Sequence, residues 1–386
     1  MANNNLTNAK RAKNDEFYTQ FVDIQKEIEA YLEYDPDVFR GKVVYCNCDD
    51  PFESNFFRYF VLNFNKLGLK QLITTSYKPS PVANTQLGLF GDDKTIEPVK
   101  GRPKITANKF VINEVHDIDG DGELNLKDVA EQLKINKHNE WAPLDGDGDF
   151  RSPECIELLK KSDIVVTNPP FSLFREYVKQ LFDYKKKFVI IGNKSSVTYK
   201  DIFPLIEDNK MWSGKTEWSG GLWFVTMDDG DVDRVVDGIK MKNVSSVWFT
   251  NLDHGRRHQP LPLMTMEENL KYSKHKEVKG KKAYHKYDNY DAIDVPFTDS
   301  IPSDYCGVMG VPISFLDKYN PEQFDIIGLG IANLGLSVGV KSYKPEHRKY
   351  RKEVQKRGTV DGDLYMIKDG VVEVPYARVL IKHKEK

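Results

Sequence analysis

The feature that most constrains the fold is a repeated alternation of short apolar runs with segments of helical spacing. The apolar runs have the length of buried strands and cover residues 42–48, 69–76, 163–167 and 187–192. The segments with helical spacing cover residues 21–34, 52–67, 152–161, 173–184 and 199–209. A strand–helix–strand order favours a parallel sheet with helices packed on it. Two aromatic-rich runs, residues 221–227 and 244–252, are expected to form late strands.

Two changes of composition divide the chain, whose 386 residues exceed one typical domain. Residues 78–146 are loosely patterned and contain several prolines and glycines, so we interpret them as an insertion. Beyond His254 the composition shifts to Lys, Tyr, Pro and Gly without clear periodicity. The sequence therefore predicts a first domain over residues 1–255, with an insertion at about 78–146, and a second region over residues 256–386.

The charge is unevenly distributed, although the whole chain carries a net charge of only −2. Residues 244–386 hold 23 Lys and Arg against 19 Asp and Glu, a net charge of +4, which leaves −6 for residues 1–243. Basic runs lie at residues 271–286 and 341–357, the second with Tyr343 and Tyr350 interleaved. Such runs can neutralise nucleic-acid phosphates. The alternative is a pair of solvated lysine-rich faces that bind nothing.

Several classes of protein are excluded by what the chain lacks. No stretch reaches about 18 consecutive apolar residues, so we predict no membrane span. The first residues are polar and lack the apolar core of a signal peptide. The four cysteines, at positions 46, 48, 155 and 306, form neither a disulfide framework nor a paired zinc pattern. A reducing, cytoplasmic setting is the expectation.

The motif with the clearest chemistry is Asn168-Pro169-Pro170-Phe171, which directly follows the predicted strand 163–167. Open parallel sheets bind their ligands at this end of their strands. The Asn168 side-chain oxygen and the Pro169 carbonyl can accept the two hydrogens of a planar amine, which frees the nitrogen lone pair to attack a methyl group. Two prolines hold the acceptors in place, and Phe171 offers a face for stacking.

The motif is therefore typical of enzymes that methylate planar amines. Adenine, guanine and glutamine amides all qualify, on DNA, RNA or protein. The alternative is a rigid proline turn with Phe171 in the core.

Longer runs make the chain resemble the EcoRI-type adenine-specific DNA methyltransferases. The runs that carry the resemblance are residues 15–20, 42–51, 54–57, 146–152, 163–174, 190–193, 250–253, 286–292 and 307–312. The resemblance implies an α/β fold with a Rossmann-like class I methyltransferase sheet, mostly parallel with late antiparallel strands, plus a C-terminal target-recognition region. It also implies methyl transfer from S-adenosylmethionine to an adenine flipped out of double-stranded DNA. A restriction–modification setting, with a cognate restriction endonuclease and a GAATTC-like site, would follow.

The resemblance also implies roles for individual residues. The catalytic loop is Asn168 to Phe171. Residues matching cofactor-binding segments are Phe17, Tyr18 and Thr19 at the methionine end, Cys48, Asp49 and Asp50 after the first strand, and Asp149 and Phe150 at the adenine. The turn at Cys48 lacks the glycines that are usual there. The acid expected to bind the ribose is absent, because Thr75 or Ser76 occupies its position.

Contacts with DNA are expected from the late strands and from the second region. Trp223 or Phe224 can stack on the flipped base, and a core role is the alternative for either residue. Arg256 and Arg257 are the predicted DNA-binding residues, since arginine suits both phosphate and guanine contacts.

An acidic segment within the predicted insertion has the spacing of an EF-hand loop. Its oxygen ligands are Asp117, Asp119, Asp121, Asn125 and Asp128, with glycine at position 6 of the loop. A structural calcium ion is the metal this spacing predicts. The alternative is an acidic hairpin built on Asp-Gly turns.

Two other functions share the catalytic motif. One is an amino-methyltransferase that acts on RNA or on a protein glutamine. The other is a catalytically inactive DNA-binding homologue. The first reading, a site-specific DNA adenine methyltransferase, is the hypothesis that the longer runs favour.

Overall fold

A computed structural model describes residues 18–48, 54–77, 107–226 and 232–384, apart from residues 123, 126, 127, 130 and 133–137. The chain forms two compact units. Unit 1 contains the described residues up to Lys194 and the segment Gly214–His254. Unit 2 contains the segment Ser195–Ser213 and the described residues from Gly255 onward. The functions predicted for the two regions of sequence stay predictions at this point.

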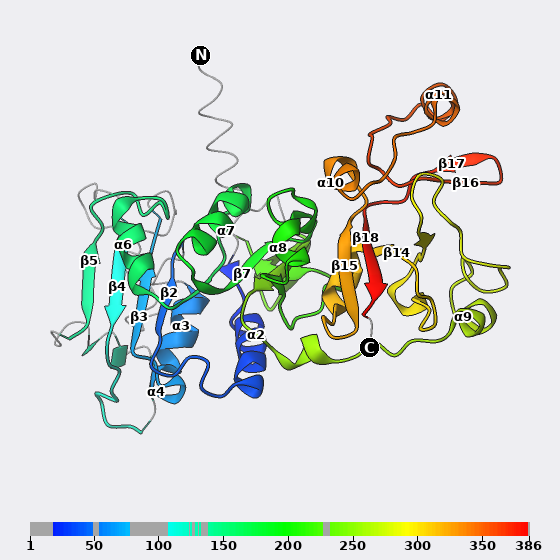
Figure 1. The fold of residues 1–386 in the computed structure, drawn as a ribbon. Helices are drawn as coiled ribbons and strands as arrows, with labels where there is room; N and C mark the ends of the chain where they lie inside the picture. Colours follow the sequence, from blue (N-terminus) through cyan, green and yellow to red (C-terminus); the bar gives the residue numbers. More distant parts are fainter. Residues whose placement is uncertain are drawn as a thin grey trace, which may run out of the picture. The chain divides into compact units, whose positions relative to one another are not determined.

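Unit 1 is built around a mixed sheet whose centre is parallel (Figure 1). Its strands are β2 (Val43–Cys46), β3 (Gln71–Thr75), β4 (Asn108–Ile112), β5 (Glu140–Pro143), β6 (Ile164–Thr167), β7 (Lys187–Asn193) and β12 (Ser246–Thr250). They lie in the order β5-β4-β3-β2-β6-β7-β12. Strand β2 pairs in parallel with β3 and β6, and β6 pairs in parallel with β7. Strand β12 is antiparallel to β7, as predicted for a late strand.

The order of the strands creates a switch point between β2 and β6. From β2 the chain passes to β3 on one side, whereas β6 and then β7 extend the sheet on the other. The crevice outside the carboxyl ends of two such strands is where open α/β sheets bind ligands. The loops that follow β2 and β6 are therefore the first place to look for a site.

Helices cover both faces of this sheet. They are α2 (Phe21–Tyr34), α3 (Asn55–Leu62), α4 (Phe64–Leu67), α6 (Pro153–Lys161) and α7 (Phe174–Asp183). One core joins side chains of α2, α3 and α4 to every second residue of the strands, such as Val44, Val166 and Ile191. On the other face, Phe174 and Phe182 of α7 contact Phe249 and Phe188. Burial on both faces explains why these strands are continuous apolar runs in the sequence.

The predicted insertion contributes to the sheet rather than leaving it. Strand β4 is antiparallel to β3, and β5 is antiparallel to β4, so both extend the sheet beyond β3. Phe110 of β4 is fully buried and stacks against Phe57 of α3, with ring centroids 5.6 Å apart. Residues 78–106 of the predicted insertion lie outside the described residues.

Two predicted helices differ from the observed ones. The helix expected over residues 52–67 is divided into α3 and α4 at Asn63, whose side-chain amide donates to the Tyr59 carbonyl, 2.8 Å away. Asparagine competes in this way with the backbone hydrogen bonds of a helix. The helix expected over 199–209 is the shorter α8 (Phe203–Glu207) of unit 2. Asn209 follows it in a left-handed conformation, with φ +55°, which ends the helix.

A smaller antiparallel sheet completes unit 1. Its strands are β1 (Tyr18–Thr19), β9 (Leu222–Val225), β10 (Arg234–Val236) and β11 (Ile239–Val244), in the order β1-β9-β11-β10. Phe224 and Leu222 of β9 face the main core of the unit. The N-terminal strand is thereby fixed beside a segment about 200 positions later in the chain.

Unit 2 combines another four-stranded sheet with short helices. Its strands are β8 (Trp212–Ser213), β13 (Ile293–Asp294), β14 (Met309–Pro312), β15 (Phe324–Leu329), β16 (Met366–Lys368), β17 (Val371–Glu373) and β18 (Arg378–His383). Strands β13-β14-β18-β15 form the sheet, and β16 and β17 form a separate hairpin. The helices, besides α8, are α9 (Met266–Tyr272), α10 (Ala332–Ser337) and α11 (Pro345–Glu353). None of the helices within the described residues is long and apolar enough to cross a membrane.

A buried carboxylate ties α2 to the segment where the chain re-enters unit 1. Glu27 is fully buried, and it accepts hydrogen bonds from the Tyr31 hydroxyl and from the backbone N–H groups of Lys215 and Thr216, at 2.7, 2.8 and 2.8 Å. The Thr216 hydroxyl donates a fourth bond, 2.6 Å long. A buried charge is tolerated when it is hydrogen-bonded in this way.

We expect Glu27→Ala to lower the free energy of unfolding by about 3 kcal/mol or more, because each buried donor left without an acceptor costs about 1–3 kcal/mol. Urea denaturation followed by tryptophan fluorescence measures the loss. The control is Glu33→Ala, an exposed glutamate on the same helix. Equal shifts for the two variants would contradict the role assigned to Glu27.

Candidate active site

The predicted catalytic loop leaves the carboxyl end of β6. All four residues of β6 are buried, Asn168 is half-buried, and Pro169 is buried. Phe171 is half-buried and packs against the main core of unit 1. It begins a 3-10 turn, Phe171–Leu173, in which the Leu173 N–H donates to the Pro170 carbonyl at 3.0 Å. The loop is thus held on both sides, by a buried strand before it and by a hydrogen-bonded turn after it.

A buried asparagine joins this loop to the end of β2. Asn47 follows β2 directly and is 2% exposed. Its backbone carbonyl accepts from the Thr167 hydroxyl, and its side-chain oxygen accepts from the Tyr177 hydroxyl of α7. Thr167 immediately precedes Asn168. The carboxyl ends of β2 and β6 are therefore fixed against each other and against α7.

The turn after β2 contains a backbone conformation that glycine usually provides, but here a cysteine adopts it. Cys48 has φ +62°, in the left-handed region that non-glycine residues rarely adopt. Strain of this kind collects at functional sites. Asp49 and Asp50, the other two residues predicted in this turn, lie outside the described residues. After the turn, the Ser54 hydroxyl caps α3 by accepting from the Phe56 and Phe57 N–H groups, at 3.1 and 3.3 Å.

The loop that contains Asp149 touches the end of β3. Gly148 has φ +79°, and a Cβ atom at this position would lie 1.9 Å from the Ser76 carbonyl oxygen. Only glycine allows this approach. The Asp149 carboxylate accepts two side-chain hydrogen bonds from Arg151, at 2.9 Å from Nε and 2.6 Å from a terminal nitrogen. These bonds lower the pKa of Asp149, so the carboxylate stays charged.

The two aromatic residues near this loop have different surroundings. Phe150 is 3% exposed, and its ring meets the Tyr177 ring edge-on, with centroids 5.0 Å apart. Tyr77, which follows β3, is half-buried. Burial raises the pKa of the Tyr77 hydroxyl, and the nearby charges of Asp147 and Asp149 add to the effect. Tyr77 was not predicted as a site residue, although an aromatic residue directly after a strand is a usable signal.

The N-terminal segment lies beside β9, one of the predicted late strands. Thr19 pairs with Phe224, and its carbonyl accepts from the Asn55 side chain at 2.8 Å. Asn55 is the first residue of α3, so this bond links the segment to the helix that follows the Cys48 turn. Phe17 and the side chain of Tyr18 lie outside the described part of the chain.

The structure separates the two aromatic residues of β9. Phe224 is fully buried in the main core, the role named as its alternative. Trp223 is half-buried, and the Arg234 guanidinium lies over its ring at 3.6 Å from the centroid. The Trp223 carbonyl also accepts from the Gln20 side chain at 2.7 Å.

Both predicted DNA-binding arginines have partners inside unit 2. Arg256 forms a two-bond ion pair with Asp317, each bond 3.0 Å long, in which both side chains are largely buried. Arg257 is 8% exposed, lies over the Trp212 ring at 3.8 Å from its centroid, and donates to the Asn209 side chain. Their contact with DNA stays a prediction.

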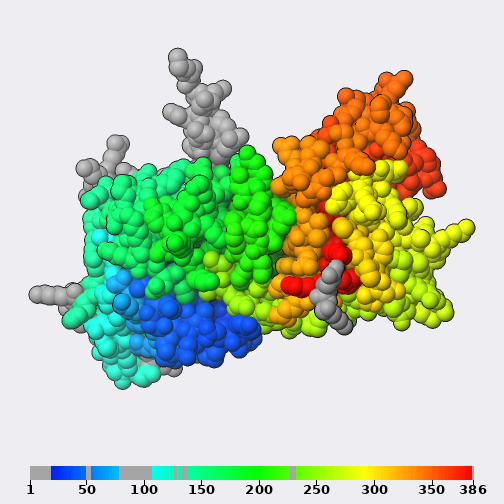
Figure 2. All heavy atoms as spheres, in the orientation of Figure 1, coloured from blue at the N-terminus to red at the C-terminus, as the bar shows by residue number. Residues whose placement is uncertain are grey.

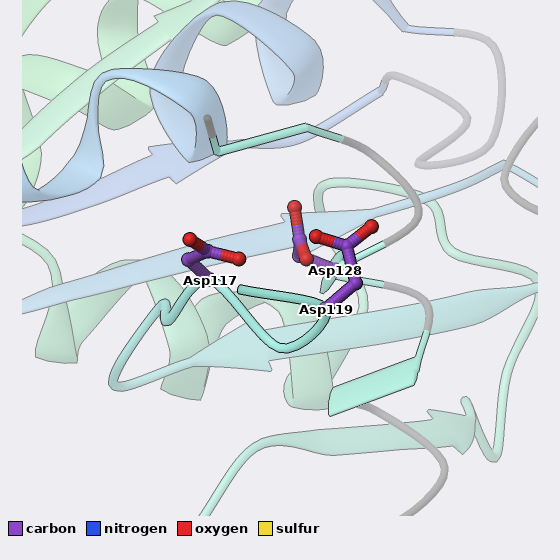
Figure 3. Close-up of side chains that lie close together, drawn as sticks. All are labelled: Asp117, Asp119 and Asp128. Carbon is purple, nitrogen blue, oxygen red and sulfur yellow. The ribbon is translucent and has the colours of Figure 1, made fainter. Parts of the chain in front are cut away.

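Three of the five predicted calcium ligands lie together. Oxygen atoms of Asp117, Asp119 and Asp128 are within 4.8 Å of one another (Figure 3). The Asn125 N–H donates to the Asp128 carboxylate at 2.8 Å, and this bond, with others from backbone N–H groups, lowers the pKa of Asp128. Asp121 is not part of this cluster.

Comparison with known proteins decides which family the chain represents. The sequence model of a family described as adenine-specific methyltransferase EcoRI matches residues 5–384. The chain belongs to this family. No solved structure matches the chain.

Three relatives are named as type II methyltransferases. M.EcoRI of Escherichia coli is 41% identical over 386 residues, which cover 98% of this chain and 96% of the relative. M.MpnI of Mycoplasma pneumoniae is 38% identical over 83% of each chain. M.MgeORF184P of Mycoplasma genitalium is 34% identical over 83% of this chain and 84% of the relative.

Membership of this family confirms the predicted enzyme class, an adenine-specific DNA methyltransferase of the restriction–modification type. Use of S-adenosylmethionine as methyl donor follows from the same membership. The fold agrees, because a large mixed sheet with a parallel centre is compatible with a methyltransferase. The roles of individual residues do not follow from the family alone.

We expect Gly148→Ala to weaken S-adenosylmethionine binding at least about tenfold, since a left-handed conformation costs a non-glycine residue about 1–2 kcal/mol and the added Cβ would collide with Ser76. Isothermal titration calorimetry measures the affinity. Gly146→Ala is the matched control, because no atom lies within 4 Å of a Cβ at that position. Unchanged binding by Gly148→Ala would separate this loop from the cofactor site.

Proposed function

We propose that the loops after β2, β3 and β6 hold S-adenosylmethionine and a target adenine next to each other, at the switch point of the sheet. The observation that carries this proposal is the hydrogen bonding of Asn47 to both Thr167 and Tyr177, which fixes the cofactor-side turn and the catalytic loop to one another. Adenine in duplex DNA is stacked and paired, so the target base is flipped into the site.

The catalytic loop acts on the adenine amino group. The Asn168 side-chain oxygen and the Pro169 carbonyl accept the two amino hydrogens and draw the nitrogen toward a pyramidal geometry. Its lone pair is then available for attack on the methyl carbon. The new carbon–nitrogen bond forms as the bond from that carbon to the sulfonium sulfur breaks, its electron pair stays on sulfur, and one amino proton passes to water. Pro169 and Pro170 restrict the backbone, so the acceptors need no rearrangement during the reaction. Phe171 supplies the stacking face.

S-adenosylmethionine, when bound, supplies a methyl group already activated by the positive sulfonium, and the residues at the sheet edge fit its adenosine. Asp149 stays ionised and can accept from an adenine amino group. Tyr77, within electrostatic reach of Asp149, is better placed than the buried Phe150 to contact the adenine ring. Cys48 contributes the backbone turn after β2. Phe17, Tyr18, Thr19, Asp49 and Asp50 keep their predicted cofactor roles within this proposal, whereas the adenine contact predicted for Phe150 passes to Tyr77.

We assign target recognition to residues 256–386 in unit 2. Their net positive charge supports contact with double-stranded DNA. Because Arg256 and Arg257 are paired with Asp317 and with Asn209, a DNA contact by either arginine would exchange that partner. A GAATTC-like site, a partner endonuclease and a cytoplasmic setting complete the proposal, supported by the relatives' names and by four free cysteines.

Asn168→Ala is expected to slow methyl transfer at least about 100-fold, the scale seen when one preorganised polar group is lost. Binding of S-adenosylmethionine should stay close to that of the wild type. The assay uses labelled S-adenosylmethionine and unmodified plasmid, followed by digestion to nucleosides. Asn168→Asp, which keeps an oxygen acceptor, should retain measurable transfer. Wild-type turnover by Asn168→Ala would exclude the assigned role, and label in RNA or protein instead of N6-methyladenine would exclude DNA as substrate.

A structural calcium ion at Asp117, Asp119 and Asp128 is the second proposal. The hydrogen bond from the Asp121 N–H lowers the pKa of Asp119, but burial and the adjacent carboxylates outweigh it and raise the pKa. A divalent cation would relieve this repulsion. Asp121 and Asn125 would join as further ligands, as the loop spacing predicts.

Calcium is expected to raise the thermal unfolding midpoint of the wild type but not of Asp119→Asn, since a ligand bound only to the folded state stabilises it. Differential scanning calorimetry with calcium or with a chelator measures the shift. Asp145→Asn, which changes an exposed aspartate outside this cluster, is the control. The same unfolding midpoint of the wild type with calcium and with a chelator would refute the site. Methyl transfer should not depend on the metal.

A further inference from the structure

Unit 2 contains a cavity of about 610 Å³ whose lining is rich in basic residues. Helix α11 and the turn after it contribute Arg351, Gln355 and Arg357 to one wall. The other walls come from the hairpin of β16 and β17 and from the first residue of β18, and they add Lys368, Glu373 and Arg378, with Asp294 at the base. The four basic side chains outnumber the two acidic ones.

The two acids are both already engaged by basic residues of the lining. Asp294 and Arg378 form an ion pair of 3.0 Å, with side chains only 5% and 14% exposed. The Tyr287 hydroxyl donates to the same Asp294 oxygen at 2.7 Å. Glu373 pairs with Lys368 at 3.0 Å in a more exposed position. The acidic side chains therefore neutralise Arg378 and Lys368, and two arginines of the lining are left over.

Arg351 and Arg357 carry this remaining positive charge, since neither forms an ion pair with any described residue. Arg351 is nevertheless held in place, because its Nε donates to the Gly358 carbonyl at 3.1 Å and a terminal nitrogen donates to Gln355 at 3.2 Å. Gln355 in turn donates to the Val372 carbonyl of β17 at 2.9 Å. The hydrogen bonds of the guanidinium are thus to neutral groups, and no direct ion pair within the described residues takes up its charge.

The wall that carries these arginines is firmly built. Arg348 of α11 donates to Asp361 at 2.5 Å, and the rings of Tyr343 and Tyr365 stack with centroids 4.6 Å apart. The His347 ring also lies 3.1 Å from the Tyr365 hydroxyl. Figure 1 shows α11 beside the β16–β17 hairpin, and Figure 2 shows their orange and red atoms on one side of unit 2.

We propose that this cavity binds a phosphodiester group of the DNA backbone through Arg351 and Arg357, and that Lys368 joins them by exchanging its half-exposed partner Glu373 for the phosphate. The proposal deepens the proposed function, on which it rests for the nature of the substrate. A planar guanidinium matches two phosphate oxygens at once. Contacts with phosphate fix the position of a protein on the duplex without reading its sequence. The cavity thus sets the register of unit 2 on DNA, and base recognition belongs to other residues.

The test is the salt dependence of DNA binding by the full-length protein. Fluorescence anisotropy with a labelled GAATTC duplex, and with a scrambled duplex, gives the slope of log Kd against log salt. Each phosphate contact that is lost lowers this slope by about 0.9. We expect Arg357→Gln to lower it by about that amount on both duplexes. Lys368→Gln is the second variant. Because Arg357 is exposed, the substitution Arg357→Gln should leave folding intact.

The matched control is Lys66→Gln, an equal loss of charge at an exposed position of α4 in unit 1. Its slope should equal that of the wild type. A wild-type slope for both cavity variants would overturn the proposal, and so would an equal loss for Lys66→Gln, which would point to unspecific charge. A further outcome is that inorganic phosphate raises the thermal unfolding midpoint of the wild type but not of Arg357→Gln, while the two proteins have the same slope in the DNA titration. In that case the cavity binds free phosphate and not DNA, and the proposal also fails.

Failure of this inference is distinguishable from failure of the proposed function. The slope reports on DNA binding, whereas N6-methyladenine reports on methyl transfer. Asn168→Ala should therefore show the wild-type slope in the same titration, although its methyl transfer is much slower than that of the wild type.

Discussion

The site depends on the hydrogen bonds that Asn47 makes at the switch point of the sheet. Two strands that diverge in topology leave a gap between the loops that follow them, and nothing in the parallel ladder itself fixes one loop against the other. The Asn47 carbonyl and side chain close this gap by accepting from Thr167 and Tyr177. Because all three residues are almost fully buried, water does not compete for these bonds. The catalytic loop therefore begins from a fixed point.

The proposed cofactor side of the site uses backbone conformation where glycine-rich loops are usual. Cys48 adopts a left-handed conformation despite its side chain, and the loop of Asp149 reaches the end of β3 only because Gly148 has none. Strain at the first position is maintained by the buried strand before it and the capped helix after it, since both over-determine the turn. Arg151 then keeps Asp149 charged beside the same edge. In the proposed function, these contacts make the ends of β2, β3 and β6 parts of one site.

The sequence predicts those parts of the molecule whose cause is local. Strands β2, β6 and β7 were expected because burial on both faces makes them apolar runs, and a catalytic role could be proposed for residues 168–171 because that chemistry needs adjacent residues. Asn47, Tyr77 and Tyr177 were not expected, because their roles come from interactions across 70 to 130 positions of the chain. The two expected helices that differ do so because Asn63 and Asn209 override the apolar spacing.

The distinction between local and distant causes also applies to the charges of unit 2. Residues 341–357 are a basic run in the sequence, but neighbours far along the chain determine which charges remain available. Asp361 engages Arg348 and Glu353 engages Lys349, whereas the hydrogen bonds of the Arg351 side chain are to neutral groups. Arg256 and Arg257, which the sequence singles out for DNA, already have partners within unit 2. A count of basic residues measures attraction to DNA in general, and only the pairing of each charge shows where a phosphate is held.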